Sequence, residues 1–275
     1  MTRLGIELAS VFGMPPVEHA RLAAQLGCAH ITVGLGRHAR NPENFPEWSL
    51  GEDAALRRDF KAALGDLGIA LAIGEGATVL PGTDVESYAA VLDIFAELGA
   101  ERIGTRCLDP DLGRSCDQFS RLAEMSAERG FLATTLEYAP YHPISHLDMA
   151  TAMIARVNMP NFRLLIDVMH LYRSGSTPDD VALLAPEIIE YVQICDIMTT
   201  PTGDDYLAEA TTERLVPGTG EIPLAALLAV LPARVPLGVE VPMLALARSG
   251  VPALERMRVC VDALRKLLPL EAAAH

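Results

Sequence analysis

Four polar side chains stand near the ends of apolar segments in the second half of the sequence. They are Glu137 in LATTLEYA, Asp167 in RLLIDVMH, Gln193 in YVQICD and Glu240 in LGVEVP. If the fold aims them at one point, they cannot all stay ionised and unpaired, because like charges repel strongly in a confined site. A divalent cation relieves this repulsion, and carboxylate and amide oxygens are hard ligands that suit Mn or Mg. One such residue is usually structural, as a helix cap or an arginine partner, but four on consecutive segments favour a shared metal site.

The segments that carry these residues belong to an alternation that runs along the whole chain. Short apolar runs, often β-branched, predict strands, and the longer amphipathic runs between them predict helices. The predicted strands cover residues 4–10, 30–35, 70–76, 102–107, 132–139, 163–170, 191–196 and 237–242. Eight strands that alternate with helices indicate a parallel (β/α)8 TIM barrel of the α/β class. A doubly wound open sheet is the alternative, but the first predicted strand lacks the glycine-rich phosphate turn typical of it.

Such a barrel would bring the four polar residues together, because active-site side chains project from the C-terminal ends of its strands. We predict one domain over residues 1–275, since no linker or shift in composition divides the chain. The charged loops at 37–53 and 199–221 are interpreted as insertions.

The composition restricts the classes of partner. A formal charge of −14 and a pI near 4.9 disfavour nucleic acid and anionic lipid. No apolar run reaches the length of about 18 residues that spans a membrane, and the first residues do not form a secretory signal. The five cysteines are scattered and form no CxxC pair. We therefore expect a soluble, cytoplasmic protein that acts on a small molecule, and its apolar helices permit a homo-oligomer.

Several segments resemble the xylose isomerase-like TIM barrels, the sugar phosphate isomerase/epimerase group that shares the AP endonuclease 2-type fold. They are LEYAP, IDVMH, YVQICD, ERLVPGTGEIP and GVEVP, and the resemblance spans essentially the whole chain. It implies one divalent metal held by Glu, Asp, His and Glu from strands five to eight. Glu137, Asp167 and Glu240 match, whereas Gln193 stands in place of the histidine. A glutamine can ligate through its harder oxygen, which favours Mn or Mg and leaves Co or Zn as alternatives.

The resemblance suggests roles for His170 and Arg214, and position near the strand ends suggests roles for three other residues. His170 and Arg214 would contact substrate oxygens; a helix cap and a surface arginine are the respective alternatives. Tyr138 and Glu75 are further candidates for substrate contact, although packing explains either of them. Asp196 would orient a metal ligand or Arg214, or else cap a helix or face solvent.

A metal flanked by two glutamates suggests proton transfer next to a carbonyl group. The resemblance makes Glu137 and Glu240 the acid/base pair of an isomerase or epimerase that acts on a ketose or related hydroxy-ketone, through an enediolate. A dehydratase or lyase of a keto-polyol, similar to inosose or dehydroshikimate dehydratases, is the alternative. A non-catalytic barrel subunit is a third hypothesis, because Gln193 departs from the family pattern. A nuclease is disfavoured, since that chemistry needs a histidine-rich zinc cluster and a basic surface.

Overall fold

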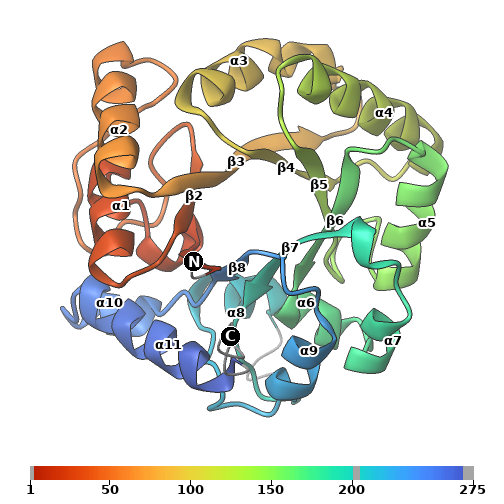
Figure 1. The fold of residues 1–275 in the computed structure, drawn as a ribbon. Coiled ribbons are helices and arrows are strands. Elements are labelled where there is room, and N and C mark those ends of the chain that lie inside the picture. Colours follow the sequence, from red (N-terminus) through yellow and green to blue (C-terminus); the bar gives the residue numbers. More distant parts are fainter. Residues whose placement is uncertain (1–2, 201–204, 269–275) are drawn as a thin grey trace, which may run out of the picture.

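The computed structural model describes residues 3–200 and 205–268, and its eight strands close into a parallel barrel (Figure 1). β1 pairs with β2 on one side and with β8 on the other, which completes the ring. The strands are β1 (Leu4–Ile6), β2 (His30–Gly34), β3 (Ala70–Val79), β4 (Arg102–Cys107), β5 (Ala133–Glu137), β6 (Phe162–Asp167), β7 (Ile189–Ile194) and β8 (Leu237–Val239). The predicted (β/α)8 fold is confirmed.

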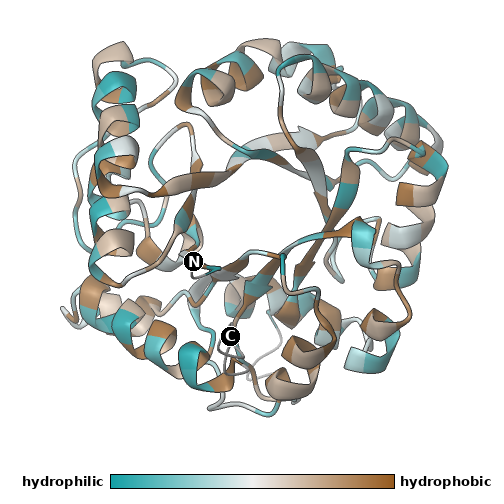
Figure 2. Cartoon of the chain, viewed as in Figure 1, coloured by the Kyte–Doolittle hydropathy of each residue, from teal (hydrophilic) through white to brown (hydrophobic). Residues whose placement is uncertain are grey.

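Helices surround the barrel and cover its outer face. Figure 2 shows hydrophilic and hydrophobic residues mixed along these helices, as expected where one side packs on the strands and the other meets solvent. The α-helices are α1 (Pro16–Gln25), α2 (Ala54–Leu67), α3 (Ala89–Leu98), α4 (Leu112–Glu128), α5 (Leu147–Val157), α6 (Val168–Arg173), α7 (Pro178–Ala182), α8 (Tyr206–Thr212), α9 (Leu224–Val230), α10 (Leu244–Arg248) and α11 (Ala253–Leu267). Short 3-10 turns are η1 (Leu8–Val11), η2 (Val85–Tyr88) and η3 (Pro186–Ile188). No helix among the described residues has the length and apolarity needed to cross a membrane.

Several strands end earlier than the sequence predicts, and the reason is local. After Ile6 the chain turns directly into η1, so β1 stops four residues before the predicted end at residue 10. β6 stops at Asp167 because the Asp167 carboxylate accepts hydrogen bonds from Met169 N and His170 N and so caps α6. These early ends place polar side chains at the rim of the barrel.

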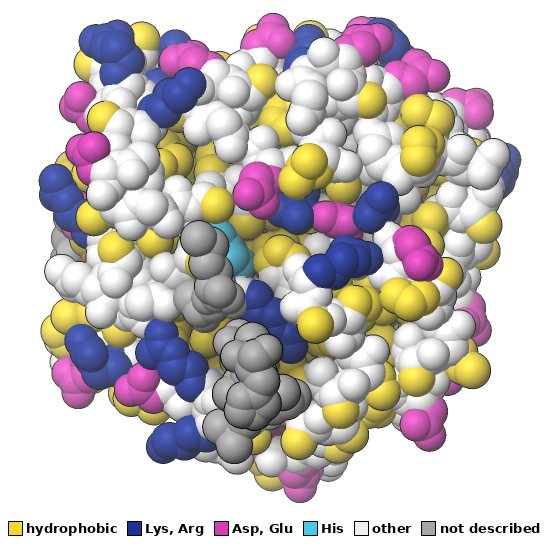
Figure 3. All heavy atoms as spheres, viewed as in Figure 1, with side chains coloured by type: hydrophobic (Ala, Val, Ile, Leu, Met, Phe, Trp, Pro, Cys, Tyr) yellow, Lys and Arg dark blue, Asp and Glu magenta, His cyan; other side chains and the backbone are white. Residues whose placement is uncertain are grey.

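The end of the barrel where the strands begin is closed by ion pairs. Arg102 Nε lies 2.8 Å from Glu190 Oε1, and Arg163 Nη1 lies 2.9 Å from Glu190 Oε2. Figure 3 shows basic and acidic side chains lying together over the centre of one face of the molecule. The charged groups near the strand starts thus compensate one another.

Two loops, at residues 37–53 and 199–221, were predicted as insertions. The first is fastened to the body: Trp48 Nε1 donates to Gly13 O at 2.9 Å, and Glu43 Oε2 accepts from Arg256 Nη2 at 2.9 Å. The second contains α8, and its residues 201–204 lie outside the described part of the chain.

Candidate metal centre and active site

A cavity of about 260 Å³ opens where the strands end. Four glutamates and two arginines contribute to its wall, so acidic groups outnumber basic ones. The polar lining residues are Glu7, His38, Glu75, Arg106, Glu137, Tyr141, His170, Gln193, Thr211, Arg214 and Glu240. This excess of carboxyl groups in a confined space is the electrostatic condition that a bound cation relieves.

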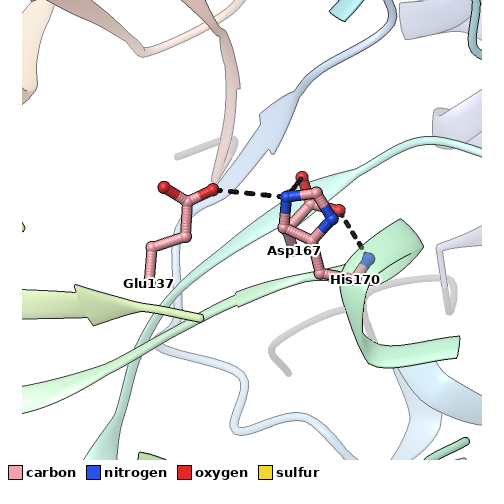
Figure 4. A group of neighbouring side chains, drawn as sticks. All are labelled: Glu137, Asp167 and His170. Carbon is pink, nitrogen blue, oxygen red and sulfur yellow. Dashed lines mark hydrogen bonds and ion pairs between the residues drawn. The ribbon is translucent and has the colours of Figure 1, made fainter. Parts of the chain in front are cut away.

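Three residues of this site form a compact group that could hold a metal ion. One ligand atom each from Glu137, Asp167 and His170 lies within 4.8 Å of the other two. His170 Nε2 is 3.7 Å from Glu137 Oε1 and 3.9 Å from Asp167 Oδ2. Figure 4 shows Glu137 reaching toward the imidazole of His170, with the Asp167 carboxylate beside the same ring. His170 therefore lies among the predicted metal ligands rather than at a distance from them.

Asp167 has the structural role that was the alternative, as a helix cap, and its other oxygen lies near the predicted site. Its Oδ1 caps α6, accepting from Met169 N at 2.7 Å, while its Oδ2 lies 2.7 Å from Arg214 Nη1. The cap fixes the orientation of the carboxylate and leaves one oxygen for the site. Burial alone would raise the pKa of Asp167, but Arg214 and then His170 outweigh burial and lower it. Asp167 is therefore a carboxylate at neutral pH.

Arg214 lies between two of the predicted metal ligands and is not a surface residue. Its side chain is buried, and Nη1 is 2.7 Å from Asp167 Oδ2 and 3.0 Å from Glu240 Oε2. Its Nε donates to Ala210 O in α8 at 2.8 Å, which holds the guanidinium in the site. Burial acts to lower the pKa of Arg214, but Asp167 and Glu240 raise it well above its ordinary value. One positive charge thus already faces these two carboxyl groups.

Glu240 follows β8 and lines the cavity, but it is outside the compact group of Glu137, Asp167 and His170. Burial raises its pKa well above the ordinary value, while Arg214 opposes this shift. Burial likewise raises the pKa of Glu137 to about 8. Burial therefore raises the pKa of both predicted acid/base residues, a shift that is common among groups that exchange protons in active sites.

Gln193 lies in β7, and its side chain contacts a residue that the sequence analysis did not select. Gln193 Nε2 donates to Glu7 Oε2 at 3.1 Å. Its Oε1 is buried and finds no hydrogen-bond partner among the described residues. A buried, unpaired amide oxygen beside a group of carboxylates fits an oxygen ligand of a hard cation.

Glu7 directly follows β1 and is almost fully buried. It accepts hydrogen bonds from the hydroxyl groups of Thr32 and Tyr191, at 3.0 and 2.5 Å, as well as from Gln193. Burial raises the pKa of Glu7 to about 7, against the effect of these three donors. In LGIELAS an acidic residue follows an apolar run, which is the pattern that identified the other site residues. Glu7 was not selected because the predicted strand at 4–10 placed it in mid-strand and not at the strand end.

Arg106 is a second residue that the sequence analysis missed. It lies in β4, directly beside Glu137 in the register of β4 with β5, and it lines the cavity. Its side chain has neither a hydrogen bond nor a close ion pair with any residue in the described ranges. Its charge nonetheless lowers the pKa of Glu75 and Glu137, in opposition to burial. Arg106 is thus a cation on the cavity wall that is free to receive an anionic group.

Of the other two residues predicted to contact substrate, one lines the cavity and one does not. Glu75 lines the cavity, as predicted. Tyr138 does not: its side chain is 0% exposed and packs in the core, because it follows Glu137 and successive side chains of a strand point to opposite faces. Tyr141 takes a place on the cavity wall instead, and Tyr206 from α8 contacts His170, with its hydroxyl 2.7 Å from Nδ1.

Asp196 acts on the loop after Arg214 and not on the Arg214 side chain. Its Oδ2 accepts from Gly218 N at 2.8 Å and from Gly220 N at 3.0 Å. A Cβ atom on Gly220 would lie 2.4 Å from Asp196 Oδ1, so only glycine allows this approach. Asp196 thereby fixes the segment that continues from Arg214.

Comparison with known proteins places the fold. A 3-dehydroshikimate dehydratase from Pseudomonas aeruginosa is 28% identical over 198 residues, which are 69% of this chain and 30% of that protein. The chain thus spans only about a third of the length of this curated relative. The crystal structure of an IolI protein with a bound zinc atom superposes with a TM-score of 0.76 at 18% identity, covering 98% of this chain and 100% of that one. A D-allulose 3-epimerase from Methylomonas sp. gives 0.70 at 18% identity, covering 96% and 97%.

The structural neighbours show the fold alone at these identities, but the family assignment has a broader basis. The model of the family described as xylose isomerase-like TIM barrel matches residues 20–267. That range contains Glu137, Asp167 and Glu240 in the order that the resemblance implies, with Gln193 in place of the histidine. The chain belongs to the xylose isomerase-like TIM barrel family.

Proposed function

We propose that this chain is a divalent-metal-dependent dehydratase of a cyclic hydroxy-ketone that carries a carboxylate, of the dehydroshikimate type. The observation that carries the proposal is Arg106, an unpaired cation adjacent to Glu137 on the wall of an acidic cavity. A neutral ketose offers no charge for such a group, whereas a substrate carboxylate pairs with it. The similarity to a 3-dehydroshikimate dehydratase supports the same substrate class.

The metal would be held by Glu137, Asp167, Gln193 and Glu240, with His170 close by. A set dominated by oxygen donors favours Mn or Mg over Zn. When bound, the cation would supply Lewis-acid stabilisation of the negative charge that develops on the substrate carbonyl oxygen. Arg106 would fix the other end of the substrate, so that the carbon between the carbonyl and the leaving hydroxyl faces the glutamates.

The proton transfers fall to the two glutamates. Glu137, as carboxylate, takes the proton from the carbon next to the carbonyl group; the electron pair forms a C=C bond and the C–O bond to the β-hydroxyl breaks. Glu240, which lines the same cavity from β8, gives a proton to the departing hydroxyl, and water leaves. A transfer from Glu137 back to Glu240 restores both groups, so the net change is the loss of one water.

An epimerase or isomerase of a hydroxy-ketone is the second candidate, because Glu137 at the end of β5 and Glu240 directly after β8 both line the cavity. Two carboxyl groups on separate sides of a substrate carbon can remove a proton from one face and return it to the other. This reaction begins with the same removal of a proton from the carbon next to the carbonyl group, but a proton then returns to that carbon and the β-hydroxyl stays in place.

One assay distinguishes the two candidates. The purified protein, loaded with Mn or Mg, is incubated with dehydroshikimate, and the dihydroxybenzoate that forms on loss of water is followed by its ultraviolet absorbance. In parallel, a panel of ketoses in D2O is followed by NMR for deuterium exchange at the carbon next to the carbonyl. We expect aromatic product from dehydroshikimate. Exchange or epimerisation of ketoses without any aromatic product would refute the dehydratase proposal in favour of the second candidate.

A further inference from the structure

Glu7 and Gln193 form a buried contact between the first and the seventh strand of the barrel, 186 residues apart in the sequence. We infer that Glu7 is a positioning residue, which fixes the amide of Gln193 so that its oxygen faces the metal site. This inference rests on the metal site proposed above, although not on the identity of the substrate.

The hydrogen bonds around Glu7 identify it as an acceptor. The Thr32 oxygen accepts from Leu8 N at 3.1 Å, so its hydroxyl proton is available for Glu7 Oε2, 3.0 Å away. The Tyr191 hydroxyl lies 2.5 Å from Glu7 Oε1 and serves the other oxygen. A carboxylate that receives two hydroxyl donors offers only lone pairs to a third neighbour.

Gln193 is that third neighbour, and its amide has two unlike ends. Only the NH2 end donates, so the carboxylate of Glu7 selects Nε2, which lies 3.1 Å from its Oε2. The opposite end, Oε1, is then directed away from Glu7, and it is buried with no partner within the described chain. The reversed amide would present N–H groups to a cation and repel it. Glu7 therefore determines whether Gln193 can act as a ligand.

The barrel makes room for this contact at Gly238. Gly238 in β8 is the register partner of Gln193, and a Cβ atom built on it would lie 1.8 Å from Glu7 Oε1 and 2.6 Å from the Tyr191 hydroxyl. Any side chain at 238 would expel the Glu7 carboxyl group from its position. The space for Glu7 is thus a built feature of the sheet, separate from the hydrogen bonds that fill it.

The test measures binding of Mn²⁺ alone, by isothermal titration of the full chain. In Glu7→Gln the new amide can donate to Gln193 Oε1, which withdraws that oxygen from the metal. Losses of partners behind a metal ligand cost about 10- to 100-fold in affinity, and we expect Mn²⁺ binding to weaken by this factor. The control is Glu190→Gln, which removes a buried carboxylate from the other end of the barrel. It should lower the melting temperature and leave Mn²⁺ affinity unchanged.

A swap variant provides a rescue that a merely structural role does not predict. In Glu7→Gln/Gln193→Glu the hydrogen bond is reversed, because an amide at 7 donates to a carboxylate at 193, which keeps an oxygen for the metal. We expect Mn²⁺ affinity to return to the wild-type value or exceed it. The inference is overturned if Glu7→Gln binds Mn²⁺ as wild type does. It is equally overturned if the swap variant does not fold or binds no better than Glu7→Gln. Failure of the enzyme to dehydrate dehydroshikimate would refute the proposed reaction and leave this inference intact.

Discussion

Replacement of Arg214 by glutamine should destabilise the folded protein, because it removes a positive charge from between two carboxyl groups of the site. Arg214 is 6% exposed and contacts Asp167 and Glu240 at 2.7 and 3.0 Å, so the variant leaves two buried carboxyl groups without their counterion. Removal of one partner of a buried ion pair costs about 3–5 kcal/mol. For a chain of this size that corresponds to a fall in Tm of roughly 6–20 °C. The measurement is the Tm of metal-free protein in EDTA, followed by calorimetry.

The loss of stability in Arg214→Gln, relative to the wild type, should depend on pH and on bound metal. Burial raises the pKa of Glu240, and loss of Arg214 removes a group that opposes this shift. A carboxyl group with a raised pKa in the folded state stabilises the fold at low pH and loses that contribution as pH rises, so the deficit should grow as pH rises above about 4.3, the ordinary pKa of Glu. Saturating Mn²⁺ should shrink this deficit, because a bound cation would compensate the negative charge of the site in place of the guanidinium. Mn²⁺ at about 100 times the wild-type Kd adds about 2.7 kcal/mol to the stability of the wild type, so a larger gain for Arg214→Gln at the same Mn²⁺ concentration is diagnostic.

A matched control separates the site from surface electrostatics. Arg121→Gln removes an arginine that pairs with Glu86 and Glu124 on the surface, where its side chain is 37% exposed. Exposed pairs contribute less than about 1 kcal/mol, so this variant should melt near wild type with or without Mn²⁺. If Arg214→Gln melts like this control, or if its deficit is the same in EDTA and in Mn²⁺, then Arg214 does not act as the counterion of the metal site.

Three further predictions concern other residues. Arg106→Ala should raise KM for a carboxylated substrate by at least about 10-fold, because a charge-assisted hydrogen bond contributes about 1.5–3 kcal/mol. Arg106→Lys should restore part of the lost affinity. An unchanged KM in steady-state assays would argue against a substrate carboxylate at this position. Burial lowers the pKa of His19 to about 3. As pH falls below about 6.5, the unfolded chain takes up a proton at His19, whereas the folded chain does not. The free energy of unfolding of the wild type should therefore fall by about 1.4 kcal/mol per pH unit because of this residue. Urea denaturation of His19→Gln should show a smaller dependence on pH. Gln193→His should keep the metal and shift its preference toward Zn or Co, as determined by elemental analysis after loading from a mixture of metals; an unshifted preference would place residue 193 outside the ligand set.

The barrel could be predicted from the sequence because each strand is recognisable from the pattern of its own residues. An apolar β-branched run between two helices is visible locally, and eight of them determine the architecture. The same local rule found Glu137, Asp167, Gln193 and Glu240, although the strands end up to four residues earlier than predicted.

The contacts between these residues could not be predicted in the same way, because they depend on register across the ring. Glu7 contacts Gln193 only because β1 and β7 both flank β8. Arg214 reaches Asp167 from a loop whose path the sequence does not specify. Tyr138 was a candidate for substrate contact, but the alternation of strand side chains directs it into the core.

Closure of the barrel has a consequence for the order in which the site forms during folding. Glu7 comes from the first strand, Gln193 from the seventh and Gly238 from the last, so their contact requires β1 to pair with β8. Loops that join such distant segments are the slowest to form, because their closure entropy is lost before any contact compensates it. The oxygen of Gln193 is therefore oriented only when the ring is complete. Metal affinity should appear late in refolding, together with the final strand pairing, and a chain that is still incomplete would hold its carboxylates without binding the ion tightly.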